Sequence, residues 1–281
     1  MQLDEASALG WRRTYFNAAT VPFWGVHVGA VVGLVLLGFS WTGLALTLAL
    51  YLVRMIFVTV GYHRYFSHRS FRTSRAFQFV LACLTMASGQ KGVLWWAAMH
   101  RHHHRHSDDP TDVHSPRHGF WWSHLGWILS PRQMVPDLAT VKDLSRYPEL
   151  RWLERNWFLP PVVVGVVTWL AGGSFGLVWA FLVPQTLIWH GSFSVNSLSH
   201  VIGTRRFATR DDSRNHWLLA LITCGEGWHN NHHHRPGSAR QGFAWWEYDL
   251  SYYFLRALAV VGVVWDLHEK PARENLEARV A

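Results

Sequence analysis

Residues 21–39, VPFWGVHVGAVVGLVLLGF, and residues 42–60, TGLALTLALYLVRMIFVTV, are two apolar runs separated by only two residues. The first run has no formal charge, and the second carries a single arginine, Arg54. Each run has about the ~20 residues that an α-helix needs to cross the hydrocarbon core of a bilayer. The short connection allows only a tight helical hairpin. The sequence therefore predicts an integral membrane protein built from helices, with its second helix over about 42–62.

A second hairpin is predicted at 157–171 and 175–195, joined by the turn AGGS. Pro160 and Pro161 lie at the start of its first helix, where proline is tolerated. The fold class is then an all-α membrane protein with four transmembrane helices in two hairpins and a helical cap. We expect a single domain over 1–281, with the cap formed by 63–156 and 196–281.

The distribution of Lys and Arg predicts the orientation. The two hairpin turns carry neither residue, whereas the polar segments on the other side are basic. The positive-inside rule places the cap and both termini in the cytoplasm. Residues 77–99 are also apolar, but Gln90, Lys91 and two glycines interrupt them. We expect this segment to lie in the membrane interface or against the helical bundle rather than to cross.

The composition narrows the function classes. Only 16% of the 281 residues are charged, against about 25% in soluble domains. The formal net charge is +8, but no basic stripe falls on a nucleic-acid-binding motif, so nucleic acid is not expected as a partner. Cys83 and Cys224 form neither a disulfide framework nor a CxxC motif. Residues 1–20 lack the apolar core of a cleavable signal peptide.

Histidines are concentrated in four stretches on the predicted cytoplasmic side. The stretches are HRYFSH (63–68), HRHHH (100–104), NSLSH (196–200) and HNNHH (229–233). In the second and fourth, histidines at i, i+3 and i+4 share one face of a helix. His63 and His68 are five residues apart, roughly 140° around an α-helix, so they converge only if the helix frays or a metal lies across its end.

This pattern predicts a pair of metal ions with four or five ligands each. Imidazole suits Zn, Cu, Fe and Ni, and the lack of a cysteine box argues against structural zinc. Four acidic residues are candidates to balance the charge or orient the imidazoles: Asp108, Asp109, Asp212 and Glu226. Ten histidines are not expected to be ligands: His102, His106 and His234, which point off the proposed faces, and His27, His114, His118, His124, His190, His216 and His268, which are expected to be structural.

These motifs, in this order around two hairpins, resemble those of the membrane fatty acyl desaturase family, which includes the stearoyl-CoA desaturases and their bacterial relatives. The resemblance covers about residues 20–270. It extends to DVHSP (112–116), GFWWSHLGWIL (119–129), GEGWHNNHH (225–233), WWEYD (245–249) and WDLHEKP (265–271).

The resemblance implies nine metal-ligating histidines: His63, His68, His100, His103, His104, His200, His229, His232 and His233. It also implies that Asn196 holds a metal-bound water and that two iron ions activate O2. The implied reaction introduces a cis double bond, at Δ9, into a saturated acyl chain. Acid–base groups cannot start a reaction at an unactivated methylene, so the cofactor must carry out the removal of hydrogen from the acyl chain.

The carrier of the acyl chain is expected to be coenzyme A, with a membrane lipid as the alternative. Arg117 aligns with a basic position near the coenzyme in the family, whereas Ala98 and Met99 replace a charged pair of many animal relatives. Thr47 and Tyr51 are candidates for the floor of the acyl tunnel. A hydroxylase or a decarboxylase acting on fatty acids is a second alternative, and a non-enzymatic membrane metal-binding protein is a remote one.

No CxxCH haem site and no iron–sulfur cysteine set is present in the sequence. Electrons are therefore expected from a separate ferredoxin, rubredoxin or cytochrome b5 with its reductase, docking on the basic cytoplasmic face. Because Arg strongly outnumbers Lys, we expect a bacterial cytoplasmic membrane.

Overall fold

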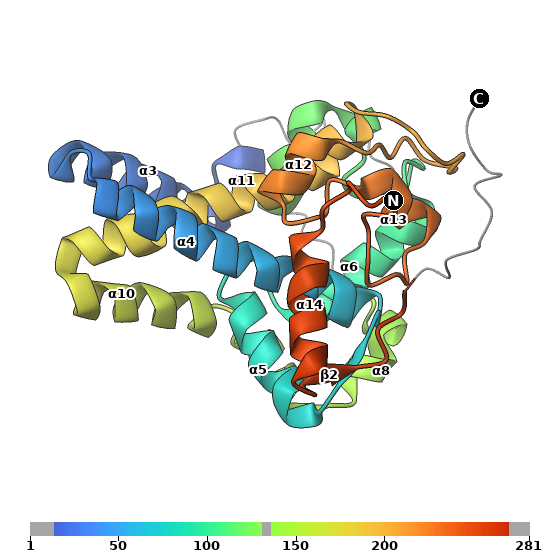
Figure 1. Cartoon of the computed structure of the whole chain (residues 1–281). Coiled ribbons are helices and arrows are strands. Elements are labelled where there is room, and N and C mark those ends of the chain that lie inside the picture. The colour runs from blue at the N-terminus through green and yellow to red at the C-terminus, as the bar shows by residue number, and fades with distance from the viewer. Residues whose placement is uncertain (1–13, 131–135, 270–281) are drawn as a thin grey trace.

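Two helical hairpins run side by side in the structure, a computed structural model that describes residues 14–130 and 136–269 (Figure 1). The first hairpin joins α3 (Val21–Leu37) to α4 (Trp41–Phe57). Gly38 turns the chain with a positive φ of 70°. The hydroxyl of Ser40 then accepts a hydrogen bond from the backbone N–H of Gly43 at 3.2 Å, which caps α4. The predicted hairpin is present, with its turn at residues 38–40.

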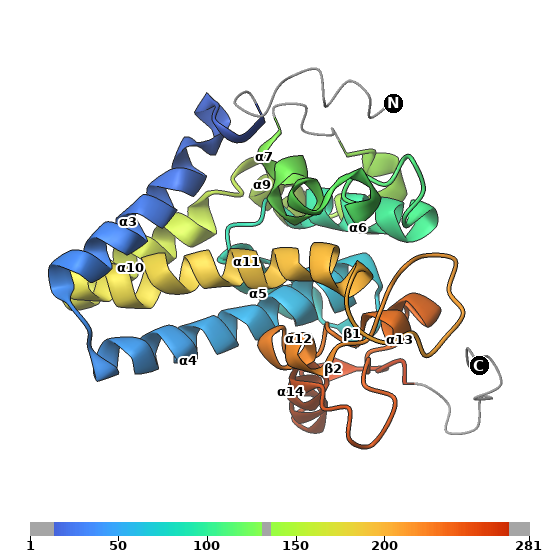
Figure 2. The same cartoon turned by 90° about the horizontal axis from the view of Figure 1, so that it is seen from above.

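The second hairpin consists of α10 (Leu159–Leu177), the π-helical segment η6 (Val178–Leu182) and α11 (Val183–Ser197). The chain reverses at Gly173, which has φ 58° and ψ −144°, inside the predicted AGGS turn. The α11 arm with η6 contacts α3, α4 and α10, so it lies among the other three long helices (Figure 2).

Three helical stretches are long and apolar enough to cross a membrane: Ala18–Leu37, Trp41–Ser67 and Leu159–His200. The third has 42 residues and contains the reversal at Gly173, so it forms two arms rather than one straight helix. Large apolar side chains such as Leu36 and Leu170 are more than 70% exposed on these helices. Such a surface fits contact with lipid.

Small residues let the helices approach closely where they cross. Gly43 of α4 faces the indole of Trp179 in η6, leaving no room for a Cβ atom. Gly61 lies against Thr85 of α5 (Arg75–Met86) in the same way. Gly61 belongs to η2 (Val58–Ser67), a fully buried π-helical extension of α4.

The apolar segment 77–99 is not one continuous helix. It divides into α5 and α6 (Val93–His106), and the residues between them include Gly89 and Lys91 with positive φ. Neither helix is among the stretches long enough to cross a membrane. The carboxylate of Glu154 accepts hydrogen bonds from the backbone N–H groups of Leu94 (2.8 Å) and Trp95 (3.2 Å), which caps α6.

The remaining elements gather at one end of the hairpins and form the cap (Figure 2). Its helices besides α5 and α6 include η3 (Pro116–His118), η4 (Trp122–Gly126), α7 (Trp127–Leu129), η5 (Leu138–Val141), α8 (Lys142–Ser145), α9 (Pro148–Arg155), η7 (Leu198–His200), α12 (Trp217–Ile222), α13 (His229–His234) and α14 (Leu250–Val260). The chain is mostly helical, as predicted. Two short strands, β1 (Arg72–Thr73) and β2 (Val264–Trp265), pair antiparallel and were not expected.

Candidate metal centre

The π-helical segment η2 brings His63 and His68 to the same side of the chain. The backbone N–H of His68 donates to the carbonyl of His63 at 3.2 Å, the i→i+5 bond of a π-turn. The two imidazole rings consequently lie 4.9 Å apart. An α-helix would separate them by about 140°. The convergence comes from this wider turn, whereas the sequence suggested either a frayed helix or a metal lying across the helix end.

The helices α6 and α13 each contribute to two clusters of imidazole groups. Within each cluster, one ring nitrogen per residue lies within 4.8 Å of the others. The first cluster contains His63, His68, His100, His104 and His232. The second contains His103, His200, His229 and His233. All nine histidines named from the sequence therefore fall into groups of five and four.

The ring nitrogens in the clusters face one another. In the first cluster, Nε2 of His232 lies 2.9 Å from Nε2 of both His63 and His104. Nε2 of His100 is similarly close to those of His68 (2.9 Å) and His104 (3.0 Å). Two imidazole nitrogens bound at right angles to one metal at about 2.1 Å would be about 3.0 Å apart. The spacing thus fits nitrogens that share a metal ion.

Four of the nine imidazoles are held through Nδ1 by a buried or mostly buried carboxylate. The pairs are His63 with Glu226 (2.5 Å), His103 with Asp112 (3.0 Å), His200 with Asp108 (2.8 Å) and His233 with Asp211 (2.7 Å). A carboxylate at Nδ1 fixes the tautomer in which Nε2 keeps its lone pair for a metal. Consistent with this, Nε2 of His233 is buried and has no hydrogen-bond partner among the described residues.

The sequence identified two of these four carboxylates. Glu226 and Asp108 orient imidazoles, as proposed, but Asp109 and Asp212 form no recorded ion pair with a histidine in the described ranges. Asp212 instead pairs with Arg117. Asp112 and Asp211 were missed, because their roles depend on how the loops after α6 and η7 fold back onto the clusters.

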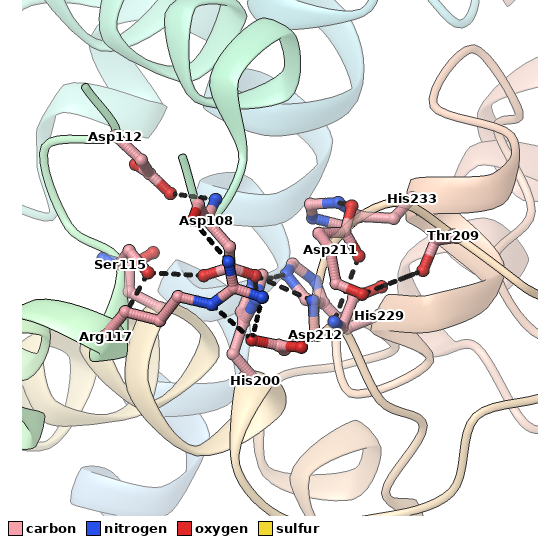
Figure 3. A network of polar contacts seen from close by, with 12 residues as sticks. Asp108, Asp112, Ser115, Arg117, His200, Thr209, Asp211, Asp212, His229 and His233 are labelled. Carbon is pink, nitrogen blue, oxygen red and sulfur yellow. Dashed lines mark hydrogen bonds and ion pairs between the residues drawn. The ribbon is translucent and has the colours of Figure 1, made fainter. Parts of the chain in front are cut away.

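Arg117 belongs to the network around Asp108 (Figure 3). Its Nε and one terminal nitrogen each lie 2.8 Å from the carboxylate of Asp212, and its other terminal nitrogen donates to the carbonyl of Asp108 at 2.9 Å. Asp108 also accepts hydrogen bonds from Ser115 and from the backbone N–H of Asp212. The role of Arg117 in binding substrate stays a prediction, because its guanidinium donates to acceptors of this same chain.

Burial keeps most of these imidazoles neutral. Burial first, and then repulsion by neighbouring imidazoles, lowers the pKa of five histidines well below the usual value: His68, His100, His104, His229 and His232. Burial also lowers the pKa of His233 to about 4, although Asp211 opposes the shift. Burial acts on His103 too, but its carboxylate partners outweigh it and raise the pKa. Neutral imidazole is the form that binds metals.

A narrow cavity of about 60 Å³ lies beside both clusters. His63 and His100 of the first cluster and His103 and His229 of the second lie in its wall, as does Asn196. The other lining side chains are mainly apolar and include Met55, Val58, Trp95, Trp96, Met99, Trp127, Ile128 and Phe193. The arrangement offers a slot for a thin apolar group next to the two imidazole clusters.

Thr47 and Tyr51 lie further along α4 and do not line this cavity. Their hydroxyl groups donate to the backbone carbonyls of Trp179 (2.6 Å) and Ile222 (2.7 Å). Their role as the floor of an acyl tunnel stays a prediction.

The ten histidines that the sequence analysis did not expect to be ligands lie outside the two clusters. His102 is half-buried and bonds to the carbonyl of Thr111, and His234 stacks on Phe207. His114 is buried against His103 and lies near Asp112.

Three further histidines form a chain that sequence analysis did not anticipate. His27 contacts His190 (3.1 Å), which contacts His124 (2.9 Å), which in turn contacts the hydroxyl of Ser197 (2.9 Å). These side-chain contacts link α3 to α11 and η4.

Comparison with known proteins agrees with this geometry. A family model described as fatty acid desaturase matches residues 39–265. The chain is 34% identical over 258 residues to an sn-1 stearoyl-lipid 9-desaturase of Anabaena variabilis, covering 91% of this chain and 92% of that protein. It is 36% identical over 260 residues to a Delta-9 acyl-lipid desaturase of Arabidopsis thaliana (92% and 84%). It is 33% identical over 274 residues to an acyl-CoA 5-desaturase of Anemone leveillei (94% and 84%).

The chain therefore belongs to the fatty acid desaturase family, whose members are oxidoreductases of lipid metabolism.

Proposed function

We propose that the protein is an O2-dependent desaturase with two iron ions that introduces a cis double bond at Δ9 of a saturated fatty acyl chain. The observation that carries the proposal is the pair of imidazole clusters beside a narrow apolar slot. The reaction converts –CH2–CH2– with O2, two electrons and two protons into –CH=CH– and two molecules of water.

The nine clustered histidines are the proposed ligands. Bound there, the two iron ions would supply the oxidising chemistry that an unactivated methylene group requires. The second cluster has one imidazole fewer than the first, and we propose that Asn196, which lies in the cavity wall, holds a water molecule as its further ligand. Asp108, Asp112, Asp211 and Glu226 hold the ligand imidazoles in the binding tautomer.

The slot positions the substrate. Trp95, Trp96 and Phe193 form apolar walls that exclude water and hold two adjacent carbons of the chain near the clusters. Trp96 also stacks on His100, with ring centroids 4.8 Å apart. The same side chain therefore packs against a proposed metal ligand and forms part of the wall of the slot. We retain Thr47 and Tyr51 as candidates for the tunnel floor.

We further propose four membrane crossings, with α3, α4 and the two arms of Leu159–His200 as the spans. The cap, both termini and the metal centre would then face the cytoplasm of a bacterium. A separate ferredoxin, rubredoxin or cytochrome b5 with its reductase would supply the electrons. The sequence motifs favour coenzyme A as the carrier, with Arg117 as its contact, and leave a membrane lipid as the alternative, which the cavities of the structure favour.

The fatty acid profile of a desaturase-deficient host tests the reaction. The host would express the intact chain, His103→Ala or His102→Ala, and double bonds would be mapped by gas chromatography–mass spectrometry. A new cis-monoene should appear with the intact chain and with the control His102→Ala, whose imidazole lies outside both clusters, but not with His103→Ala. An oxygenated or shortened product would instead indicate a hydroxylase or a decarboxylase. No new lipid despite membrane expression and a compatible electron donor would contradict the proposal.

A further inference from the structure

A second and much larger cavity, about 710 Å³, lies between α3, α10 and α11. Its size is within the range of cavities that bind small ligands, roughly 300–1,000 Å³. The lining is mainly apolar, and its polar side chains include Thr20, Gln90, Lys91 and Gln185. We call this cavity the lateral groove, and its lining residues between positions 157 and 169 are Trp157, Phe158, Pro161, Val162, Gly165, Val166 and Trp169.

These residues recur at helical spacing, so one face of α10 forms a wall along the groove. From Leu159, where α10 begins, to Trp169 the helix rises by about 15 Å at 1.5 Å per residue. One leaflet of the ~30 Å hydrocarbon core is about 15 Å deep. The groove therefore has the length of an acyl chain in one leaflet of the bilayer.

The groove is open on its outer side. Val162 and Val166 line it and are still 53% and 48% exposed. Both belong to a helical stretch that is long and apolar enough to cross a membrane. Lipid would therefore have direct access to the groove from the side.

The groove adjoins the narrow slot beside the histidine clusters. Gln90, Ile128 and Phe193 line both cavities, so these three side chains form a shared wall. The side chains of Gln90 and Ser192 are joined by a hydrogen bond of 2.9 Å at this wall. A chain lying in the groove is thus separated from the metal centre by a single layer of residues.

The slot is poorly suited to the phosphates of coenzyme A. Among the described residues that line it, none is a lysine or an arginine. Arg117, the one residue that the motifs assign to the coenzyme, has its guanidinium bonded to Asp212 and to the carbonyl of Asp108. An acyl group esterified to a membrane lipid needs no such cationic site next to the slot.

We propose that this chain takes its acyl group from a bilayer lipid, which enters sideways through the lateral groove and passes the wall formed by Gln90, Ile128 and Phe193. The inference rests on the proposed desaturase function and specifies its substrate class. It makes the groove a binding site for the acyl chain of a diacyl lipid.

A matched pair of substitutions on α10 tests the route. Val166→Trp fills the groove, whereas Val167→Trp places the same side chain at a position that is 56% exposed and outside the groove. The iron-loaded full-length proteins would be reconstituted with ferredoxin, its reductase and NADPH. One set of vesicles would contain phosphatidylglycerol with 13C-stearoyl chains, and another would contain unlabelled lipid with added 13C-stearoyl-CoA.

We expect the intact protein and Val167→Trp to desaturate the labelled lipid, and Val166→Trp to do so at least tenfold more slowly with an unchanged Tm. A phosphatidylglycerol with a diazirine-bearing acyl chain provides a second readout. After irradiation, it should label residues 157–169 in the intact protein and in Val167→Trp, but not in Val166→Trp.

Three outcomes would overturn the inference. If stearoyl-CoA is desaturated and the lipid is not, the lipid route is wrong while the proposed function stands. If Val166→Trp abolishes labelling without slowing lipid desaturation, the groove holds a bystander lipid. If neither substrate is desaturated, the proposed function fails and the substrate assignment falls with it.

Discussion

The carboxylate of Glu226 lies 2.5 Å from Nδ1 of His63, and both side chains are almost fully buried. The same carboxylate contacts the guanidinium of Arg64, and Arg64 contacts Asp249. His63 of the first histidine cluster is therefore held by a buried network of charged side chains that reaches into the C-terminal part of the cap.

Glu226→Gln should weaken metal binding without removing a ligand. The amide keeps the volume of the side chain but loses the negative charge that makes the imidazole of His63 a stronger electron donor to a bound metal. Loss of such a partner typically lowers metal affinity about 10–100-fold. Iron retention against a competing chelator would measure the change. Glu149→Gln, in an exposed pair with Arg75, is the matched control and should retain iron like the intact protein; equal retention in all three proteins would contradict the role of Glu226.

Asp249→Asn should lower the free energy of unfolding by about 3–5 kcal/mol, because it removes one of the two carboxylate charges that compensate the fully buried guanidinium of Arg64. Thermal unfolding of the metal-free protein in detergent would detect the change. Asp266→Asn removes an exposed partner of Arg72 and should have little effect. A similar Tm for both variants would show that the buried network does not hold the cap.

Gly61→Ala should destabilise the junction of η2 with α5. The added methyl group would collide with Thr85, and overpacking of this kind costs about 1–3 kcal/mol. Gly25→Ala in α3 meets no neighbouring atom within 4 Å and is the control. Combining Gly61→Ala with Thr85→Ala should restore part of the lost stability. Failure of this rescue in a double-mutant cycle would argue against a direct clash.

The metal-free protein should lose stability as the pH falls from about 6.5 to 4. The pKa of His233 is about 4 in the folded protein, so between these values the unfolded chain binds a proton that the folded chain does not. The depressed pKa values of the neighbouring imidazoles act in the same direction. Tm measured across this range should fall less steeply for His233→Gln, whereas His102→Ala should follow the intact protein. A flat profile for the intact protein would contradict the assignment of neutral buried imidazoles.

The hairpins and the nine clustered histidines could be predicted because each depends on short-range pattern. Apolar runs of helical length predicted α3, α4 and the two arms joined near Gly173. Spacing at i, i+3 and i+4 marked His100, His103 and His104 as one face of α6. Neither inference needs knowledge of distant contacts.

The features that sequence analysis missed depend on tertiary structure. The π-turns of η2 widen the helix where Gly61 packs on Thr85. They bring the side chains of His63 and His68, which are five residues apart, to the same side of the helix. The division into clusters of five and four arises because α6 and α13 each run between them. The path of a loop determines that Asp211, rather than its neighbour Asp212, pairs with His233, and residue spacing does not encode that path.

The composition of the first cluster also dictates an order of assembly. His63 and His232 are separated by 169 residues, and His104 and His232 by 128. During synthesis the first hairpin and α6 are made well before α13 leaves the ribosome. A five-imidazole site therefore cannot close until most of the chain has been translated. The proposed metal, once bound there, would act as a cross-link between segments far apart in the sequence and would reduce the freedom of the unfolded chain.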